Sequence, residues 1–233
     1  ERLSSLVGSE MCIRDRLIGL LRQEYRGYDS AGLAIFDDAN QVQVFKSTGK
    51  VAELQNSIDK NPVNGNLGIA HTRWATHGIP TETNAHPHHS NNNVFVIHNG
   101  IIENHQEIRT TLKALGYVFE SETDTEVIAH LIHAKMSKEG ASLVEALQLS
   151  VKDLRGAYAI GAVCETEPGI LAAARKGSPL VVGIGHGENF IASDQLALAD
   201  FAEKFVFLEE GDLAEIKSSG TKFWNLNDEE VER

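Results

Sequence analysis

The sequence is poor in cysteine, in long apolar runs and in clustered positive charge. Only Cys12 and Cys164 occur among 233 residues, too few for a disulfide framework. No segment has the uninterrupted apolar length that a membrane-spanning helix needs. The net charge is −12, and no run of Lys or Arg offsets it locally, which disfavours nucleic acid and acidic membrane surfaces as partners. These absences favour a protein of the reducing cytoplasm.

The N-terminal segment also lacks the features of a natural start. Residues 1–16 begin without Met and contain no apolar region long enough for a signal peptide. The stretch SLVGSEMCIRDR resembles a translated adaptor or linker, so we interpret residues 1–16 as non-native and exclude them from the expected fold. One globular domain is expected over residues 17–225, followed by a charged frayed tail or a linker to a missing region over residues 226–233.

The hydrophobic pattern predicts a mixed fold in which runs of strands and paired helices occur without strict alternation. The segment Thr123 to Glu126 matches a helix capping box, and Asn99-Gly100 is a turn signal that ends the strand before it. Residues 17–24 have the pattern of a helix end. Further helices are expected at 51–58 and 102–115, from 123 onward and at 142–154. Strands are expected at 31–36, 42–45, 67–70, 94–97, 157–164, 170–174, 180–184, 190–192, 205–208 and 213–216.

The densest polar cluster comprises His71 to Gly78 and Asn84 to His89. One interpretation is a metal site, but no cysteine or carboxylate stands at a ligand spacing. A second treats the histidines as loop residues that hydrogen-bond the backbone. A third is a loop that closes over an amino-acid substrate, with a carboxylate fork, a rigid lid and two hydrogen-bonding arms. Those four groups would be Arg73, Trp74, Thr76 and His77.

Two further groups have competing interpretations. Asp124 could receive the α-amino group of such a substrate, although an Asp near a helix N-terminus also stabilises the helix. The Asn99 amide and the Gly100 backbone N–H form either a turn or the two donors of an oxyanion hole. An oxyanion hole requires a nucleophile. The sequence has no Gly-x-Ser-x-Gly elbow, and Cys164 lies in an apolar strand, where cysteine is inert.

Several motifs, taken in order, resemble those of class II glutamine amidotransferases, most closely the branch that forms glucosamine 6-phosphate. The resemblance implies an α+β N-terminal nucleophile hydrolase fold, a four-layer αββα sandwich with two antiparallel sheets. It also implies hydrolysis of glutamine to glutamate and ammonia without a cofactor. The motifs are Arg26 to Gly32, His71 to Gly78, His98 to Asn104, Ser121 to Glu126, Leu154 to Tyr158 and Ser178 to Leu180.

The resemblance further implies that a C-terminal sugar isomerase region of the full-length enzyme uses the ammonia to convert fructose 6-phosphate, and that this enzyme is a homodimer. Within the present chain the resemblance implies that Arg73 binds the glutamine α-carboxylate and Asp124 its α-ammonium. Thr76 and His77 would position the substrate, and Asn99 with Gly100 would form the oxyanion hole. Trp74 would belong to the covering loop, and Arg26 and His86 would support the site.

The nucleophile of that family is an N-terminal cysteine whose own α-amino group serves as general base. It opens a Cys-Gly-Ile-Val-Gly strand, which would fall where Glu1 to Ser5 stand. Cys12 is a poor substitute, because it lies only 14 residues before Arg26 (26 − 12) and charges follow it. We therefore expect an intact glutamine pocket without its nucleophile, and sheet hydrogen bonds left unpaired by the lost strand.

Two alternatives to this hypothesis remain open from the residues. The first is a non-catalytic module that binds glutamine. The second is a class II amidotransferase with another acceptor.

Overall fold

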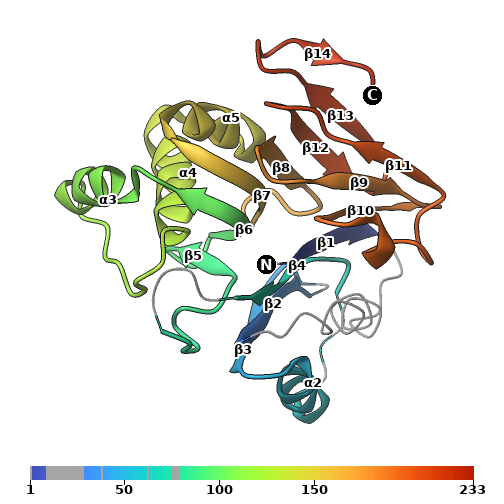
Figure 1. The fold of residues 1–233 in the computed structure, drawn as a ribbon, viewed down its shortest axis with the longest axis horizontal. Coiled ribbons are helices and arrows are strands. Elements are labelled where there is room, and N and C mark those ends of the chain that lie inside the picture. The colour runs from blue at the N-terminus through green and yellow to red at the C-terminus, as the bar shows by residue number, and fades with distance from the viewer. Residues whose placement is uncertain (1, 9–28, 38, 62, 64, 75–78) are drawn as a thin grey trace.

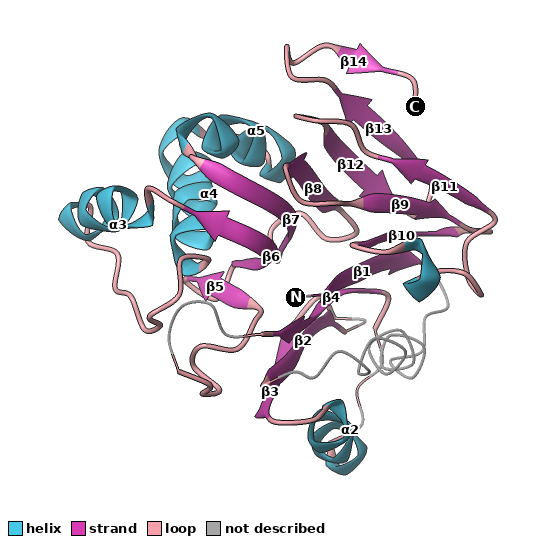
Figure 2. Ribbon diagram, in the orientation of Figure 1, coloured by secondary structure: helices cyan, strands magenta, loops and turns pink. Residues whose placement is uncertain are grey.

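Two antiparallel sheets pack face to face in the computed structural model, and helices cover their outer faces (Figures 1 and 2). The structure describes residues 2–8, 29–37, 39–61, 63, 65–74 and 79–233. Each sheet has seven strands within these residues. The expected four-layer αββα sandwich is therefore confirmed.

Among the described residues, one short helix lies on the outer face of the first sheet, sheet A. That helix, α2 (Val51–Lys60), buries Val51, Leu54 and Ile58 against the hydrophobic side chains of β2. The strand order is β11 (Lys204–Phe207), β9 (Val181–Ile184), β10 (Glu188–Ala192), β1 (Arg2–Gly8), β4 (Leu67–Arg73), β2 (Ser30–Phe36) and β3 (Val42–Thr48). A single 3₁₀ turn, η2 (Gln195–Ala197), follows β10.

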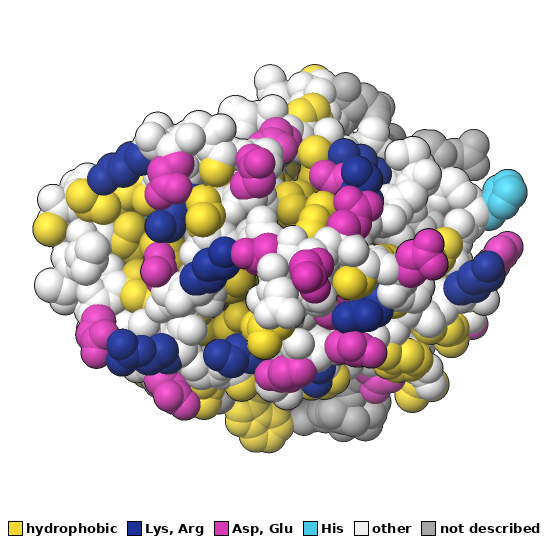
Figure 3. Space-filling model, turned by 90° about the horizontal axis from the view of Figure 1, so that it is seen from above, with side chains coloured by type: hydrophobic (Ala, Val, Ile, Leu, Met, Phe, Trp, Pro, Cys, Tyr) yellow, Lys and Arg dark blue, Asp and Glu magenta, His cyan; other side chains and the backbone are white. Residues whose placement is uncertain are grey.

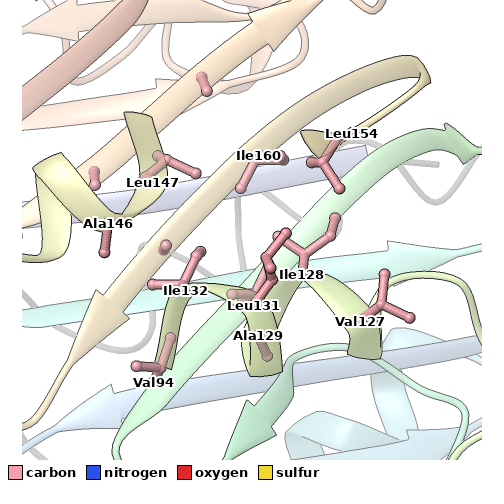
Figure 4. Close-up of a cluster of buried hydrophobic side chains, with 14 of the residues drawn as sticks. Val94, Val127, Ile128, Ala129, Leu131, Ile132, Ala146, Leu147, Leu154 and Ile160 are labelled. Carbon is pink, nitrogen blue, oxygen red and sulfur yellow. The ribbon is translucent and has the colours of Figure 1, made fainter. Parts of the chain in front are cut away.

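The second sheet, sheet B, is covered by α3 (His105–Ala114), α4 (Glu126–Glu139) and α5 (Leu143–Asp153). Figure 4 shows the aliphatic side chains of α4 and α5 packed on β6 and β7. The strand order is β14 (Glu230–Val231), β13 (Gly220–Trp224), β12 (Leu213–Lys217), β8 (Leu171–Lys176), β7 (Gly156–Cys164), β6 (Val94–Ile102) and β5 (His88–Ser90). No helix among the described residues is long and apolar enough to cross a membrane.

The core between the sheets sets the position of the polar residues. Side chains alternate along a strand, so Ile69 of β4 and Ile97 of β6 face the same inter-sheet core. Two residues further along, the same faces carry His71 and Asn99. The inter-sheet layer thus changes from apolar to polar at one end of β4 and β6.

Residues 2–8 correct our exclusion of the N-terminal segment from the fold. They form β1, which pairs with both β4 and β10 in the middle of sheet A. Leu3 and Val7 are buried in the inter-sheet core, so the strand position is filled and the expectation of unpaired sheet bonds is wrong there. An extended segment with apolar side chains on the core face satisfies the open strand edges. The non-native origin of residues 1–16 stays a prediction.

Most of the strands and helices expected from the sequence are confirmed, but the turn at Asn99-Gly100 is wrong. The strand β6 continues to Ile102, because β7 pairs with it as far as Gly156. Gly100 has a φ of 131°, and a Cβ there would lie 2.0 Å from the Ala157 carbonyl oxygen. Glycine is required for close approach of the two strands, and not for a turn. The expected helix end at 17–24 lies outside the described residues.

The capping box expected at Thr123 to Glu126 is also wrong. The helix α4 begins at Glu126, and its N-cap residue Thr125 makes no side-chain cap bond. The Glu126 carboxylate instead accepts hydrogen bonds from the backbone N–H groups of Glu120 and Ser121. A capping box does begin α5, where the Ser142 side chain and Glu145 cap each other.

The charged C-terminal segment is not frayed. Glu230 and Val231 pair with β13, and the Arg233 guanidinium donates to both carboxylate oxygens of Asp212 at 2.7 and 2.8 Å. Asp212 is buried, so this bidentate pair fixes residue 233 against the turn before β12. A linker beyond this point remains a prediction.

The burial of Ser5 in β1 predicts how a substitution there changes the free energy of unfolding. The Ser5 hydroxyl is buried opposite Ile69 and Ile191 without a hydrogen-bond partner in the structure, and such a group costs about 1–3 kcal/mol. Ser5→Ala should therefore raise the free energy of unfolding by about 1 kcal/mol or more. Urea denaturation checks this, with Ser219→Ala at an exposed site as the neutral control. A loss of stability in Ser5→Ala would show that residues 2–8 do not occupy this core strand.

Candidate functional site

A hydrogen bond between His71 and Asn99 joins the two sheets at their polar end. His71 Nε2 lies 2.8 Å from Asn99 Oδ1, and the two residues are 1% and 7% exposed. His71 belongs to β4 of sheet A and Asn99 to β6 of sheet B. The contact therefore fixes the Asn99 side chain, proposed from the sequence as an oxyanion donor, relative to the strand that ends at Arg73.

Three buried histidine rings contact one another beside this hydrogen bond, one pair tilted and the other edge-to-face. The ring centroids of His71 and His86 are 4.0 Å apart, and those of His86 and His88 are 4.8 Å apart. Gly32 makes room for the stack, since a Cβ on Gly32 would lie 2.0 Å from the His86 carbonyl oxygen. The last glycine of the motif Arg26 to Gly32 is thus needed for the close approach of His86.

Burial keeps these imidazoles neutral. Desolvation lowers the pKa of His71 to about 3, against the opposing effect of its bond with Asn99. Desolvation also lowers the pKa of His86 and of His88 well below the usual histidine value. A neutral imidazole has one N–H donor and one acceptor nitrogen, so each ring can make a directional bond without bringing a charge into the core.

Arg73 places a buried cation at the end of β4. Its side chain is 2% exposed, and its Nη1 lies 3.9 Å from Asp29 Oδ1. A guanidinium has five N–H donors, enough to bind a ligand carboxylate in addition to Asp29. Trp74, the next residue, is 57% exposed, which is compatible with a residue that covers a ligand from outside.

Asp124 lies between the end of β6 and the start of α4. Its Oδ2 accepts a hydrogen bond of 2.7 Å from the Ile102 backbone N–H, and the residue is 5% exposed. This bond fixes the carboxylate on the strand and not on the first turn of α4, so the helix-stabilising interpretation is not what the contact shows. Nearby, His98 Nδ1 lies 3.0 Å from Thr125 Oγ1, which ties β6 to the N-terminus of α4.

These groups have the chemistry expected for binding a zwitterionic amino acid. Arg73 supplies a cation and Asp124 a carboxylate. Asn99 supplies an amide at the contact between β4 of sheet A and β6 of sheet B. Asn99 and Ile102 are three residues apart on β6, roughly 10 Å along an extended strand. That length suits an extended amino-acid side chain with a hydrogen bond of about 3 Å at each end.

A second polar network extends from the histidine stack toward a groove. Thr123 Oγ1 lies 3.0 Å from both His88 Nε2 and Ser121 Oγ, and Ser121 donates to Glu126. Burial alone would raise the pKa of Glu126, but the nearby His130, the Ser121 hydroxyl and the backbone N–H groups of 120 and 121 lower it to about 2.

The groove beyond this network has a volume of about 770 Å³. Burial lowers the pKa of Lys46 in it to about 8, although three carboxylates nearby oppose the shift. Its lining includes Lys46, Glu82, His88, Glu120, Glu126 and Glu165, but not Arg73, Asn99 or Asp124. Acidic and basic side chains are also interspersed on the face of the molecule in Figure 3. The titratable lining of the groove is mainly acidic, and the groove shares only His88 with the site described above.

Several residues expected at the site are not brought there or are not described. Arg26, Thr76 and His77 lie outside the described residues, as does Cys12. Cys164 faces the helices on the opposite side of sheet B from Asn99 and is fully buried, and burial raises the pKa of its thiol. In the described part of the chain, no group of three or more His, Cys, Asp or Glu side chains could hold a metal ion.

Sequence reasoning missed the roles of His71, Gly32 and Thr125. His71 was included in the polar cluster without a task of its own, because no local pattern shows which residue it meets 28 positions later. The signal that could have found it is strand alternation, which places His71 on the core face with Ile69.

The chain was compared with protein families and with curated proteins. The model of a family described as "Glutamine amidotransferase domain" matches residues 71–200. The chain is 54% identical over 215 residues to the glutamine--fructose-6-phosphate aminotransferase [isomerizing] of Pseudomonas aeruginosa, covering 92% of this chain and 35% of that protein. It is 53% identical over 217 residues to the protein of the same name from Escherichia coli K12, covering 93% and 35%.

Solved structures agree as well. The glutamine phosphoribosylpyrophosphate amidotransferase from B. subtilis, complexed with ADP and GMP, superposes with a TM-score of 0.82 at 25% identity, covering 97% of this chain and 49% of that one. The chain spans about a third of the length of the curated relatives that it matches.

Because these histidines are uncharged in the folded chain, we predict that the free energy of unfolding falls in mild acid. His71, His86, His88 and His98 all have lowered pKa values in the folded chain because of burial, whereas unfolded histidine titrates near 6.5. The unfolded state binds more protons below that pH, so each group removes about 1.4 kcal/mol of stability per pH unit.

Urea unfolding between about pH 7 and pH 5 measures this slope, above the range in which unfolded carboxylates titrate. His86→Gln should flatten the slope, and His186→Gln, at an exposed site, should leave it unchanged. Equal stability at the two pH values would contradict the assignment.

Proposed function

Because the chain belongs to the glutamine amidotransferase domain family, we propose that its polar end binds L-glutamine and hydrolyses the side-chain amide to glutamate and ammonia. The observation that carries this proposal is the hydrogen bond that joins the Asn99 carboxamide of β6 to His71 of β4, the strand that ends at Arg73. The same strand β6 anchors the carboxylate of Asp124 through the Ile102 N–H, so an amide donor, a cation and an acid are all attached to these two strands.

In the proposed complex, Arg73 binds the α-carboxylate of glutamine through two parallel N–H donors. Asp124 accepts from the α-ammonium through the oxygen that Ile102 does not use. The side-chain carbonyl then lies against Asn99 Nδ2 and the Gly100 N–H, which stabilise the oxyanion of the tetrahedral intermediate. We propose that Thr76, His77 and Trp74 complete and cover this pocket, and that Arg26 and His86 support it.

The larger reaction is also a proposal. The relatives named above suggest that the ammonia is used by a sugar isomerase region C-terminal to this chain, which converts fructose 6-phosphate to glucosamine 6-phosphate. We propose this acceptor, a homodimer of the full-length protein and a cytoplasmic location.

The nucleophile requires a separate proposal. In the family chemistry, an N-terminal cysteine thiolate attacks the amide carbon of glutamine, ammonia leaves as the thioester forms, and water then releases glutamate. The first strand begins at the site, since Arg2 pairs with Thr72, the neighbour of Arg73. We propose that this is where the nucleophile acts and that a polypeptide beginning Glu1-Arg2 binds glutamine without hydrolysing it.

Glutamine binding gives the first test of this function. Isothermal titration of residues 1–233 with L-glutamine should show one site. Arg73→Lys and Asp124→Asn should each weaken binding at least about tenfold, because each loses a charge-assisted bond worth about 1.5–3 kcal/mol. The matched controls Arg155→Lys and Asp59→Asn, both at exposed positions, should bind normally. Unchanged affinity in both site variants would rule out the proposed pose.

Ammonia release gives the second test. Residues 1–233 should release none from glutamine above background. The combined change Glu1→Cys, Arg2→Gly, Leu3→Ile, Ser4→Val and Ser5→Gly, exposed by removal of an initiator Met, should introduce turnover because it places a thiol and its own amine at the start of β1. If residues 1–233 release ammonia from glutamine, and the Cys12→Ser variant still does so, the assignment of the nucleophile is contradicted.

A further inference from the structure

The orientation of the Asn99 carboxamide determines whether it can stabilise an oxyanion. Its Nδ2 is a donor and attracts a developing negative charge, whereas its Oδ1 is an acceptor and repels one. We propose that His71 is a positioning residue that donates its Nε2–H to Asn99 Oδ1 and so directs Nδ2 toward the reacting carbonyl. The inference rests on the proposed function for the identity of the anion, but not for the contact itself.

The geometry of the contact supports this role. The 2.8 Å separation of His71 Nε2 and Asn99 Oδ1 is that of a well-formed hydrogen bond. The two residues lie on strands of opposite sheets, so the bond sets the position of the amide across the inter-sheet layer. Because both side chains are almost completely buried, water cannot replace His71 as the partner of Oδ1 without a rearrangement of the core.

The protonation state of His71 makes the bond directional. Burial keeps the ring neutral, and a neutral imidazole has a single N–H. Placing that hydrogen on Nε2 makes Asn99 Oδ1 the only suitable acceptor of the amide. The opposite tautomer would instead accept from Asn99 Nδ2 and turn Oδ1 toward the substrate. The His86 ring packs against the imidazole, and Gly32 allows the His86 backbone to approach closely enough for this contact.

The tautomer can be measured on residues 1–233 without glutamine. Long-range ¹⁵N–¹H correlation spectra of the histidine rings distinguish Nε2–H from Nδ1–H, and the spectrum of His71→Phe assigns the His71 signals. We expect the neutral Nε2–H form, unchanged between about pH 8 and pH 5. An Nδ1–H ring, or a His71 ring that titrates near the usual histidine value, overturns the proposal.

Binding and kinetics separate positioning from general structural support. Glutamine affinity should change less than about threefold in His71→Phe, because the proposed ground-state contacts to Arg73 and Asp124 remain. In the variant with an N-terminal cysteine, His71→Phe should lower kcat about 10- to 100-fold with little change in KM. His71→Gln, whose amide nitrogen reaches a similar position, should restore most of kcat. Unchanged kcat in a folded His71→Phe overturns the proposal, as does a loss confined to KM.

The proposal and the underlying function fail in different ways. If glutamine does not bind to residues 1–233 but the ring is Nε2–H, the proposed function fails and the His71–Asn99 bond stands. If glutamine binds and the ring is Nδ1–H, the function stands and the role of His71 is wrong.

Discussion

The hydrogen bond between His71 and Asn99 is the contact on which the organisation of the site depends. The two sheets are joined elsewhere mainly by apolar packing, which is non-directional and sets the distance between the layers better than it sets the orientation of one amide. The directional bond between His71 and Asn99 across that layer fixes a polar group where the apolar core ends. The strand ending at Arg73 and the strand leading to Asp124 are thereby placed in one frame.

The same end of the sandwich contains several imidazoles that burial holds neutral. A charged network there would carry a large desolvation cost, whereas neutral rings stack and hydrogen-bond at a lower one. This arrangement lowers the free energy of unfolding in mild acid, because the histidines of the unfolded chain bind protons there and the buried histidines of the folded chain do not. Among the described residues, the site thus combines the buried guanidinium of Arg73 with histidine rings that carry no charge near neutral pH.

Much of the fold followed from local patterns. The hairpin at Ala31 to Phe45, the helix after Ser142 and the apolar strand ending at Cys164 were predicted with nearly correct limits, because hydrophobic spacing decides these elements locally. The motifs also pointed to Arg73, Asp124, Asn99 and Gly100. The contacts of Asp124 and Asn99 could not be predicted, since each is made with a strand far away in the sequence.

The errors have a common physical cause. Gly100 was expected in a turn because Asn-Gly favours one locally, but a neighbouring strand selects glycine there for close approach. Glu126 was expected to cap its own helix, but it binds the backbone of the preceding loop instead. Residues 2–8 were excluded from the expected fold because the segment resembles a linker, although Leu3 and Val7 give the strand a face in the core. In all three cases tertiary contacts outweighed the local signal.

A crystal structure of residues 1–233 with L-glutamine tests the account most directly. It should show the α-carboxylate on Arg73, the α-ammonium on Asp124 and the side-chain carbonyl oxygen within hydrogen-bond distance of Asn99 Nδ2, with Oδ1 still on His71. Glutamine bound instead in the groove lined by Lys46 and Glu126, or an Asn99 amide turned to present Oδ1 to the ligand, would contradict it.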